Sequence, residues 1–353
     1  SGLRKNNGFE TVNKYQDRSV CCILRHTLNF RRRKLQIVRR FFKTKESAVI
    51  LMFTGLFLVT SIIAPSFLSY AQLINLFRTI SLSLLPAMGM VFVMTCGSID
   101  LSAGSVLAFS GMLCGYTMVM WNWNLVPAIL LSLAVSALVG VVNGFLIARW
   151  NLTPMIVTLG VQYVIRGLVN VITKGVAISG FSEEFVNIGQ GKVGVIPNVI
   201  IIAVVVFCIC LFLYNFTVFG RSIISTGGNK ETTRLAGINV TAYIVSAHVV
   251  CSLLAGMAGI LVTSRLGSAQ ASAGMTTDMY AIASAAVGGT SLMGGSGSIV
   301  GCLFGVGIME LITIALTLIK VDVYWQRTVV GIIMIAAVFM DVYRRNSSQR
   351  SGS

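Results

Sequence analysis

The sequence predicts an all-α polytopic membrane protein with about ten transmembrane helices and no soluble domain. Of its 353 residues, 55% are hydrophobic and only 11% are charged, whereas soluble domains carry about 25% charged residues. Apolar runs such as 195–214 and 243–262 match the roughly 20 residues that cross a hydrocarbon core about 30 Å thick. The alternating pattern of outer-membrane barrel strands is absent from the sequence.

The apolar segments divide the chain into ten expected crossings. In chain order they are 48–64, 80–96, 101–120, 126–148, 153–173, 195–216, 241–264, 280–293, 298–319 and 325–342. An even number of crossings puts both termini on one side, which the basic residues Arg149, Arg344 and Arg345 identify as the cytoplasm. Eight crossings would satisfy this charge distribution almost as well. Residues 48–343 therefore form one expected transmembrane domain.

The N-terminal segment 1–47 is an expected basic cytoplasmic arm. It holds thirteen Lys or Arg residues against three acidic ones, out of a net charge of +16 for the chain. Apolar and basic residues alternate irregularly in 31–45, a pattern that favours anionic lipid headgroups over nucleic acid. We expect no nucleic-acid partner and an uncleaved anchor. The C-terminal segment 344–353 is an expected disordered tail.

Cysteine and histidine usage argues against a metal site or an enzyme. The eight cysteines are scattered and form no CxxC pair, and there are only two histidines. A nucleophile–base or metal cluster needs more such groups close together. His26 and His248 are therefore expected to supply neither, and we predict no metal ligands and no catalytic residues.

Two glycine-rich stretches, 96–105 and 287–298, interrupt the apolar pattern within the membrane. Such paired interruptions are typical of broken helices that line a transport path, but small residues also allow close helix packing. For 96–105 a structural turn is the preferred interpretation, with Asp100 as N-cap of a helix that starts near Leu101. The candidate path residues are Asp100, Ser102, Asn143, Gln162, Gly288, Gly289, Thr290, Gly294 and Gly295.

The segment 220–240 is a polar, net-positive island between two long apolar spans. Asn229 suits an N-cap, Glu231 lies in the expected first turn and Gly237 follows as a stop signal, so a short helix is predicted over 230–236. Such a helix can seat in the groove of a partner protein, or it is an ordinary polar connection. The candidate contact residues are Asn229, Lys230, Glu231, Thr232, Arg234, Leu235 and Gly237.

Four stretches resemble the permeases of ATP-binding-cassette importers of the ribose-type sugar branch. GGNKETTRLAGINV (227–240) is similar to the cytoplasmic coupling segment, and SIDLSAGSVLA (98–108) is similar to the "GIDLS-x-G" segment of that branch. The region 264–301 resembles the long C-terminal signature, and PSFLSYAQLINLFRTIS (65–81) resembles the first outside loop. The resemblance covers roughly 48–343. Departures at Ser98, Met279 and Tyr280, together with a longer basic arm, leave the transported sugar open.

The resemblance implies a bacterial plasma-membrane importer for ribose or a similar monosaccharide. Two permeases would pair, expected as a homodimer, although a homologous partner stays open. Each would dock one cytoplasmic ATPase through the coupling segment, and an extracytoplasmic sugar-binding protein would deliver the substrate. The chain itself has no GxxxxGK[ST] phosphate loop, so ATP and Mg²⁺ are expected on the partner ATPase and no cofactor on this chain.

Two alternatives stay open. A permease of the same family could carry a hexose, inositol or a furanone-type signal. An ion-coupled secondary transporter would need a carboxylate-centred relay near the midplane, for which the sequence offers few candidates, chiefly Asp100 and Glu310. Arg166 is expected to pair with a backbone carbonyl or to reach an interface.

Overall fold

The computed structural model describes residues 45–322, 324–326, 328–336 and 339. The chain divides into two units, 1–48 and 49–353, and of the first unit only 45–48, the start of helix α2, is described. The expected basic arm up to residue 44, the C-terminal tail and parts of the crossing expected at 325–342 therefore lie outside the described residues.

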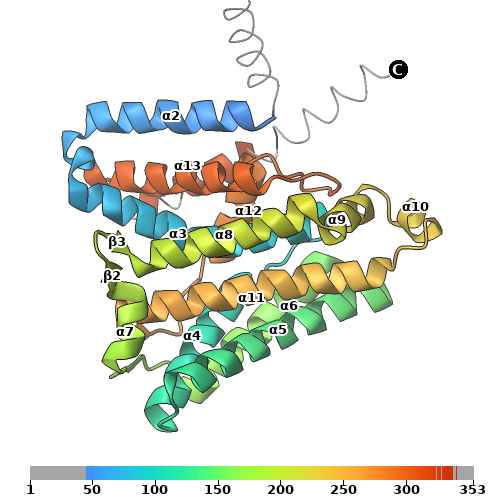
Figure 1. The fold of residues 1–353 in the computed structure, drawn as a ribbon, viewed down its shortest axis with the longest axis horizontal. Helices are drawn as coiled ribbons and strands as arrows, with labels where there is room; N and C mark the ends of the chain where they lie inside the picture. Colours follow the sequence, from blue (N-terminus) through green and yellow to red (C-terminus); the bar gives the residue numbers. More distant parts are fainter. Residues whose placement is uncertain (1–44, 323, 327, 337–338, 340–353) are drawn as a thin grey trace, which may run out of the picture. The chain divides into compact units, whose positions relative to one another are not determined.

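The described part is mainly helical, with a few short strands (Figure 1). The elements are α2 (Lys45–Ile63), η1 (Pro65–Leu68), α3 (Tyr70–Thr95), α4 (Ala103–Met120), α5 (Leu125–Trp150), α6 (Pro154–Thr173), β1 (Ile178–Ser179), α7 (Glu183–Gln190), β2 (Lys192–Val193), β3 (Ile196–Pro197), α8 (Asn198–Phe216), α9 (Val218–Gly228), α10 (Lys230–Leu235), α11 (Val240–Leu266), β4 (Ser268–Ala269), α12 (Thr277–Val287) and α13 (Ile299–Leu318). Strand β1 pairs antiparallel with β4, and β2 pairs antiparallel with β3.

Local sequence signals set several helix boundaries. The side chains of Ser69, Asn239 and Ser298 accept hydrogen bonds from backbone amides in the first turns of α3, α11 and α13, which satisfies donors that have no partner inside the helix. Helix α11 ends at Leu266 and is capped by Gly267, whose φ of +63° is the left-handed conformation that glycine adopts at low cost.

Most expected crossings correspond to helices, but the count of ten is not confirmed. Among the described residues, seven helices are long and apolar enough to cross a membrane: α3, α4, α5, α6, α8, α11 and α13. Two expectations were wrong in extent. Helix α3 begins at Tyr70, inside the stretch expected to be an outside loop, and the crossing expected at 280–293 is the 11-residue helix α12 followed by a glycine-rich loop.

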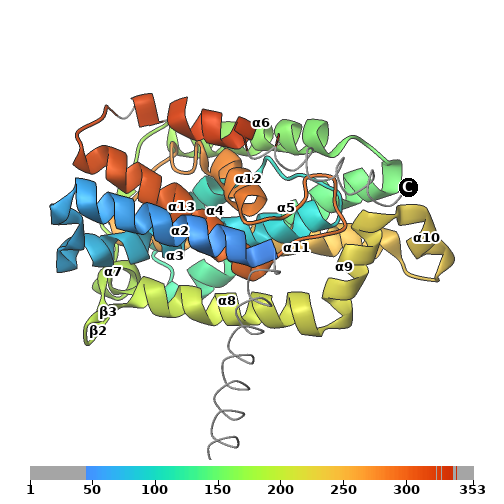
Figure 2. The same cartoon turned by 90° about the horizontal axis from the view of Figure 1, so that it is seen from above.

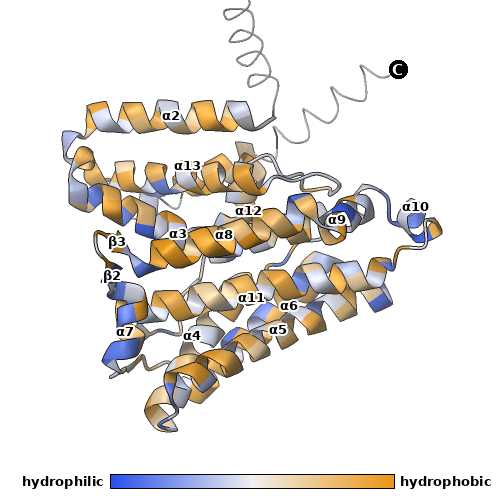
Figure 3. Ribbon diagram, in the orientation of Figure 1, coloured by the Kyte–Doolittle hydropathy of each residue, from blue (hydrophilic) through white to orange (hydrophobic). Residues whose placement is uncertain are grey.

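The two ends of the helical bundle are more polar than the region between them. Figures 1 and 2 place α10 at one end and α7 with β2 and β3 at the other. Figure 3 shows that hydrophilic residues gather at these ends, whereas the helices between them are mostly hydrophobic. This distribution is what a membrane-spanning domain requires, because charged groups are costly within the hydrocarbon core.

Helix α11 packs against α3, α4 and α5. Glycine permits this approach: a Cβ atom added to Gly144 on α5 would lie 2.5 Å from Cα of Val245, and one added to Gly140 would lie 2.6 Å from Cα of Val249. On α3, the same test at Gly89 gives 2.7 Å to Cα of Cys251. Small residues give close backbone contact between membrane helices, where the hydrophobic effect adds little to association.

A glycine pair provides a test of this packing. Gly144→Ala should destabilise the folded protein by about 1–3 kcal/mol, because the new methyl group overpacks the α5–α11 contact. Gly160→Ala on α6 is the matched control, since no described atom outside its own helix lies within 4 Å of a Cβ added there. Thermal unfolding in detergent should show a lower Tm for Gly144→Ala only. Equal Tm values for the two variants would contradict the packing account.

Candidate functional site

The polar island folds as two helices, the end of α9 followed by the short helix α10. Helix α10 spans Lys230–Leu235, one residue shorter than predicted, and Asn229 is its N-cap: the Oδ1 atom accepts a hydrogen bond from the Thr232 amide at 3.0 Å. The hydroxyl groups of Ser225 on α9 and Thr233 on α10 lie 2.8 Å apart. Helices α9 and α10 are therefore fixed to each other, and α10 projects at one end of the molecule (Figure 1).

The outer surface of α10 combines an apolar side chain with an ion pair. Leu235 is 82% exposed, and Arg234 lies 3.6 Å from Glu231 with both side chains largely exposed. Gly237, with φ of +79°, turns the chain from α10 toward α11. The short helix α10 thus presents one apolar side chain and two charged side chains to solvent.

Just before α10 in the chain, the end of α9 meets two other glycine-rich segments through their backbones. We call this contact the glycine junction; it consists of Gly97, Gly227, Gly228, Gly294 and Gly295. A Cβ added to Gly294 would lie 2.8 Å from both Cα of Gly97 and the Gly227 carbonyl oxygen, and one added to Gly295 would lie 2.9 Å from Cα of Gly228. The Gly295 amide also donates to the Thr95 carbonyl at 2.9 Å. The junction joins the end of α9 to both glycine-rich interruptions.

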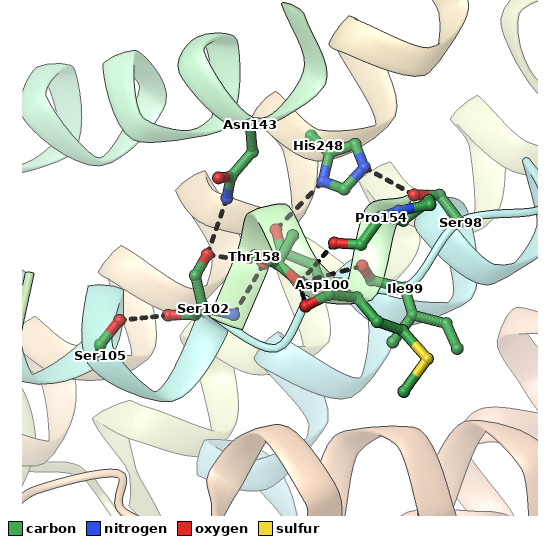
Figure 4. Close-up of polar contacts among 10 residues, drawn as sticks. Ser98, Ile99, Asp100, Ser102, Ser105, Asn143, Pro154, Thr158 and His248 are labelled. Atoms are coloured by element: carbon green, nitrogen blue, oxygen red, sulfur yellow. Dashed lines mark hydrogen bonds and ion pairs between the residues drawn. The ribbon is translucent and has the colours of Figure 1, made fainter. Parts of the chain in front are cut away.

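The interruption at 96–105 contains a buried polar cluster centred on Asp100 and His248 (Figure 4). His248 Nδ1 lies 3.2 Å from Asp100 Oδ2, and His248 Nε2 lies 2.9 Å from Ser98 Oγ. Asp100 Oδ1 accepts hydrogen bonds from the Ser102 amide at 2.9 Å and from its hydroxyl at 2.6 Å. Asn143 donates to Ser102 Oγ at 2.8 Å. The cluster ties α5 and α11 to the loop between α3 and α4.

The structure corrects the expected role of Asp100. Helix α4 begins at Ala103 with Ser102 at the N-cap position, so Asp100 is not the N-cap. It instead accepts two hydrogen bonds from Ser102 and faces His248. The carboxylate thus stabilises the turn that precedes the helix.

The histidines were expected to form no nucleophile–base cluster, but His248 is hydrogen-bonded to both a serine and an aspartate. Ser98, His248 and Asp100 have the bonding order of a serine–histidine–aspartate triad. The three side chains are, however, at most 4% exposed, so the serine hydroxyl is enclosed rather than presented to a substrate. The arrangement is that of a structural network in which Ser98, His248 and Asp100 each have a hydrogen-bond partner. Groups of three or more potential metal ligands do not occur in the described part of the chain.

Of the remaining path candidates, Gly288, Gly289 and Thr290 lie in the segment between α12 and α13, whereas Gln162 lies on α6. Gly288 packs against Gly301 of α13, with a hypothetical Cβ 2.6 Å from the Gly301 carbonyl, and Thr290 is 1% exposed. Gly289 adopts φ of +90°. Gln162 lies apart from these residues, on α6. These contacts are those of close packing, and a role of the candidate residues in lining a path stays a prediction.

The isolated charges found in the sequence have partners in the structure. Ser83 on α3 donates to Glu310 Oε1 on α13 at 2.6 Å. Arg166 NH1 donates to the carbonyls of Ala271 and Ala273 at 2.7 and 2.8 Å, so the expected carbonyl pairing of Arg166 is confirmed. Sequence reasoning missed the partnership of His248 with Ser98 and Asp100, for which the signal was a histidine inside an apolar segment. It also missed the contact between Gly97 and Gly227, for which the signal was that both lie in glycine-containing interruptions of the apolar pattern.

Adjacent glycines at the end of α9 test the junction. Gly227→Ala should reduce stability and any coupled activity, because its Cβ would overlap the Thr95 carbonyl and lie 2.7 Å from the Gly295 amide nitrogen. Gly228→Ala should be tolerated, since apart from its chain neighbours and its own helix backbone no described atom lies within 4 Å of its added Cβ. Both variants are compared by thermal unfolding and by activity of the assembled complex. A Gly228→Ala defect equal to that of Gly227→Ala would refute the junction.

Comparison with known proteins identifies the family. The model of the family described as branched-chain amino acid transport system / permease component matches residues 72–338. The chain is 36% identical over 310 residues to a ribose import permease protein of Haemophilus influenzae, covering 87% of this chain and 95% of that protein. It is 40% identical over 294 residues to a ribose import permease protein of Bacillus subtilis, covering 82% and 91%.

A third relative, the L-arabinose ABC transporter permease protein of Azospirillum brasilense, is 34% identical over 301 residues, covering 85% of this chain and 88% of that protein. No solved structure matches the chain. The family model matches residues 72–338, and seven helices of the described region are long and apolar enough to cross a membrane. The chain belongs to this permease family and is a multi-pass membrane transport subunit rather than an enzyme.

Proposed function

We propose that the chain is the membrane-spanning subunit of an ATP-driven, binding-protein-dependent importer that moves ribose or a similar monosaccharide into the cytoplasm. The observation that carries this proposal is the similarity, over more than four fifths of the chain, to permeases whose names specify ribose. Related permeases named for L-arabinose and D-allose are similar over 85% and 78% of this chain. These names favour a monosaccharide over the amino acids of the family description.

In this proposal, α10 is the element that the cytoplasmic ATPase contacts. Its exposed Leu235 and the Arg234–Glu231 pair provide a small mixed surface, with Asn229, Lys230, Thr232 and Gly237 completing the coupling segment. ATP and Mg²⁺ belong to the ATPase, and this chain supplies no phosphate loop. An extracytoplasmic binding protein delivers the sugar at the opposite end of the bundle.

Movement of α10 can reach the membrane core by two physical connections. Helix α11 starts at Val240, three residues after Gly237, and His248 lies two turns along it, or about 12 Å. There it holds Asp100 and thus the loop before α4. The glycine junction forms the second connection, from the end of α9 to the loop between α12 and α13. Contiguous packed elements of this kind carry coupling between distant sites.

The proposed topology has ten crossings, both termini in the cytoplasm and a location in the bacterial inner membrane. Residues 47–63 of α2 are apolar and within the range of about 17–25 residues that spans a bilayer. Helix α12 crosses together with its following loop, since Gly295 reaches Thr95 beside the α9–α10 end. A crossing by the segment expected at 325–342 brings the number of crossings to ten.

A second copy of the chain is the proposed partner permease, and the arm 1–47 is proposed to contact lipid rather than nucleic acid.

ATP hydrolysis in lipid nanodiscs tests the proposal. The chain is purified with the ATPase and the binding protein encoded beside it, and hydrolysis is measured with and without ribose. Hydrolysis that ribose stimulates only in the presence of the binding protein is expected. Hydrolysis stimulated instead by another monosaccharide, or by a branched-chain amino acid, would reassign the substrate, and failure to bind any ATPase would refute the importer.

Charge and apolar substitutions on α10 test its role. Leu235→Asp and Arg234→Glu should each reduce co-purification of the ATPase at least about tenfold, because both side chains are exposed at the proposed contact. Gly237→Pro should abolish transport, since proline cannot adopt φ of +79°. Lys192→Glu, on β2 at the opposite end, is the control and should retain the ATPase. Normal ATPase retention and transport in all three variants would show that α10 is not the contact.

A further inference from the structure

A pocket whose lining includes polar side chains opens beside α6, away from α10. It has a volume of about 330 Å³, at the lower end of the roughly 300–1,000 Å³ typical of small-molecule sites. Its lining comprises Arg166, Asn170, Gly175, Ala177, Gln270, Ala271, Ser272 and Met275. The pocket thus lies between the second half of α6 and the segment that follows β4.

One wall of the pocket is held in place by Arg166. Within the described part of the chain, its guanidinium donates to three carbonyl groups: those of Ala271 and Ala273 at 2.7 and 2.8 Å, and that of Gly104 at 3.3 Å. These bonds fix the 271–273 segment to α6 and to the start of α4. The buried carboxylate of Asp278 acts electrostatically on the same guanidinium. The positive charge of Arg166 is therefore compensated without a ligand.

A polar stripe connects this pocket with the buried cluster. Thr158, Gln162, Arg166 and Asn170 recur every four residues on the mostly apolar helix α6, and that spacing places them on one face. At one end Thr158 Oγ1 lies 3.4 Å from the Ile99 carbonyl, next to Asp100. Between the ends, Gln162 Oε1 is buried and has no hydrogen-bond partner among the described residues. An unpaired buried acceptor on such a stripe is available to a hydroxyl donor.

We propose that this pocket is the site on the permease that receives the sugar, and that its side chains bind a neutral polyhydroxylated ligand; this inference rests on the proposed function. Asn170 and Gln270 offer amide donors and acceptors, and Ser272 offers a hydroxyl. None of the eight lining residues is acidic, so the ammonium group of an amino acid would find no carboxylate there. The pocket chemistry therefore selects a sugar over a branched-chain amino acid.

The position of the pocket suits reception of a ligand at the end opposite the ATPase. Gln270 follows β4, which follows the C-terminal end of α11, whereas α10 precedes the N-terminal end of that helix. The 27 residues of α11 separate these ends by about 40 Å. Arg166 contacts the carbonyl of Gly104, four residues after Asp100, so a shift of the Asp100 loop would act directly on the pocket wall.

The test compares apolar replacements of the two amide side chains with a neighbouring control. The complete importer, with ATPase and binding protein, is reconstituted in proteoliposomes, and ribose taken up per ATP hydrolysed is measured. Asn170→Leu and Gln270→Leu should each lower this ratio about fivefold, the factor expected from one lost hydrogen bond. Val171→Leu, next to Asn170 but 76% exposed, should keep the wild-type ratio.

A deoxyribose series separates a binding role from a structural one. If Asn170 bonds a sugar hydroxyl, one of the deoxyriboses should be transported less well than ribose by the wild type, and Asn170→Leu should lose that discrimination. Unchanged ratios in both leucine variants, or full discrimination retained in Asn170→Leu, would overturn the pocket assignment while leaving the importer intact. A wild-type complex that transports no sugar would overturn the proposed function as well.

Discussion

Close backbone packing around α11 is the constraint on which the rest of the molecule depends. This helix contacts α3, α4 and α5, and glycines such as Gly140 and Gly144 allow its neighbours to approach within van der Waals distance. Because interiors packed in this way are not continuously deformable, α11 behaves as a rigid element. It begins directly after the proposed ATPase contact and ends beside the pocket that we assign to the sugar, so both sites are positioned by one helix.

The Asp100–His248 network fixes the position of α11 relative to the loop between α3 and α4. A charged or polar group at membrane depth is costly unless it is bonded, and both side chains are fully buried with partners on separate elements. Removal of one partner would leave the other buried and unpaired, which is costly. The network therefore fixes the irregular backbone before α4 relative to α11, and irregular backbone within a membrane is tolerated only where protein satisfies it.

The fold class and most helices could be predicted because they follow from apolar segment length alone. The α10 helix and its Asn229 cap could be predicted because capping is a local interaction. Long-range features could not: nothing in sequence spacing indicates that His248 would lie between Ser98 and Asp100, or that Gly227 would meet Gly97 and Gly294. The length of α12 was also missed, since an apolar stretch rich in small residues reads equally as a helix or a loop.

The central claim is that this chain moves a sugar with energy from ATP. It is tested most directly by uptake of radiolabelled ribose into proteoliposomes that contain the permease, its ATPase and its binding protein, with a protonophore present. The account predicts accumulation that requires ATP on the ATPase side and the binding protein on the other, and that survives collapse of the proton gradient. Uptake that needs no ATPase and stops with the protonophore would contradict the account and identify an ion-coupled transporter.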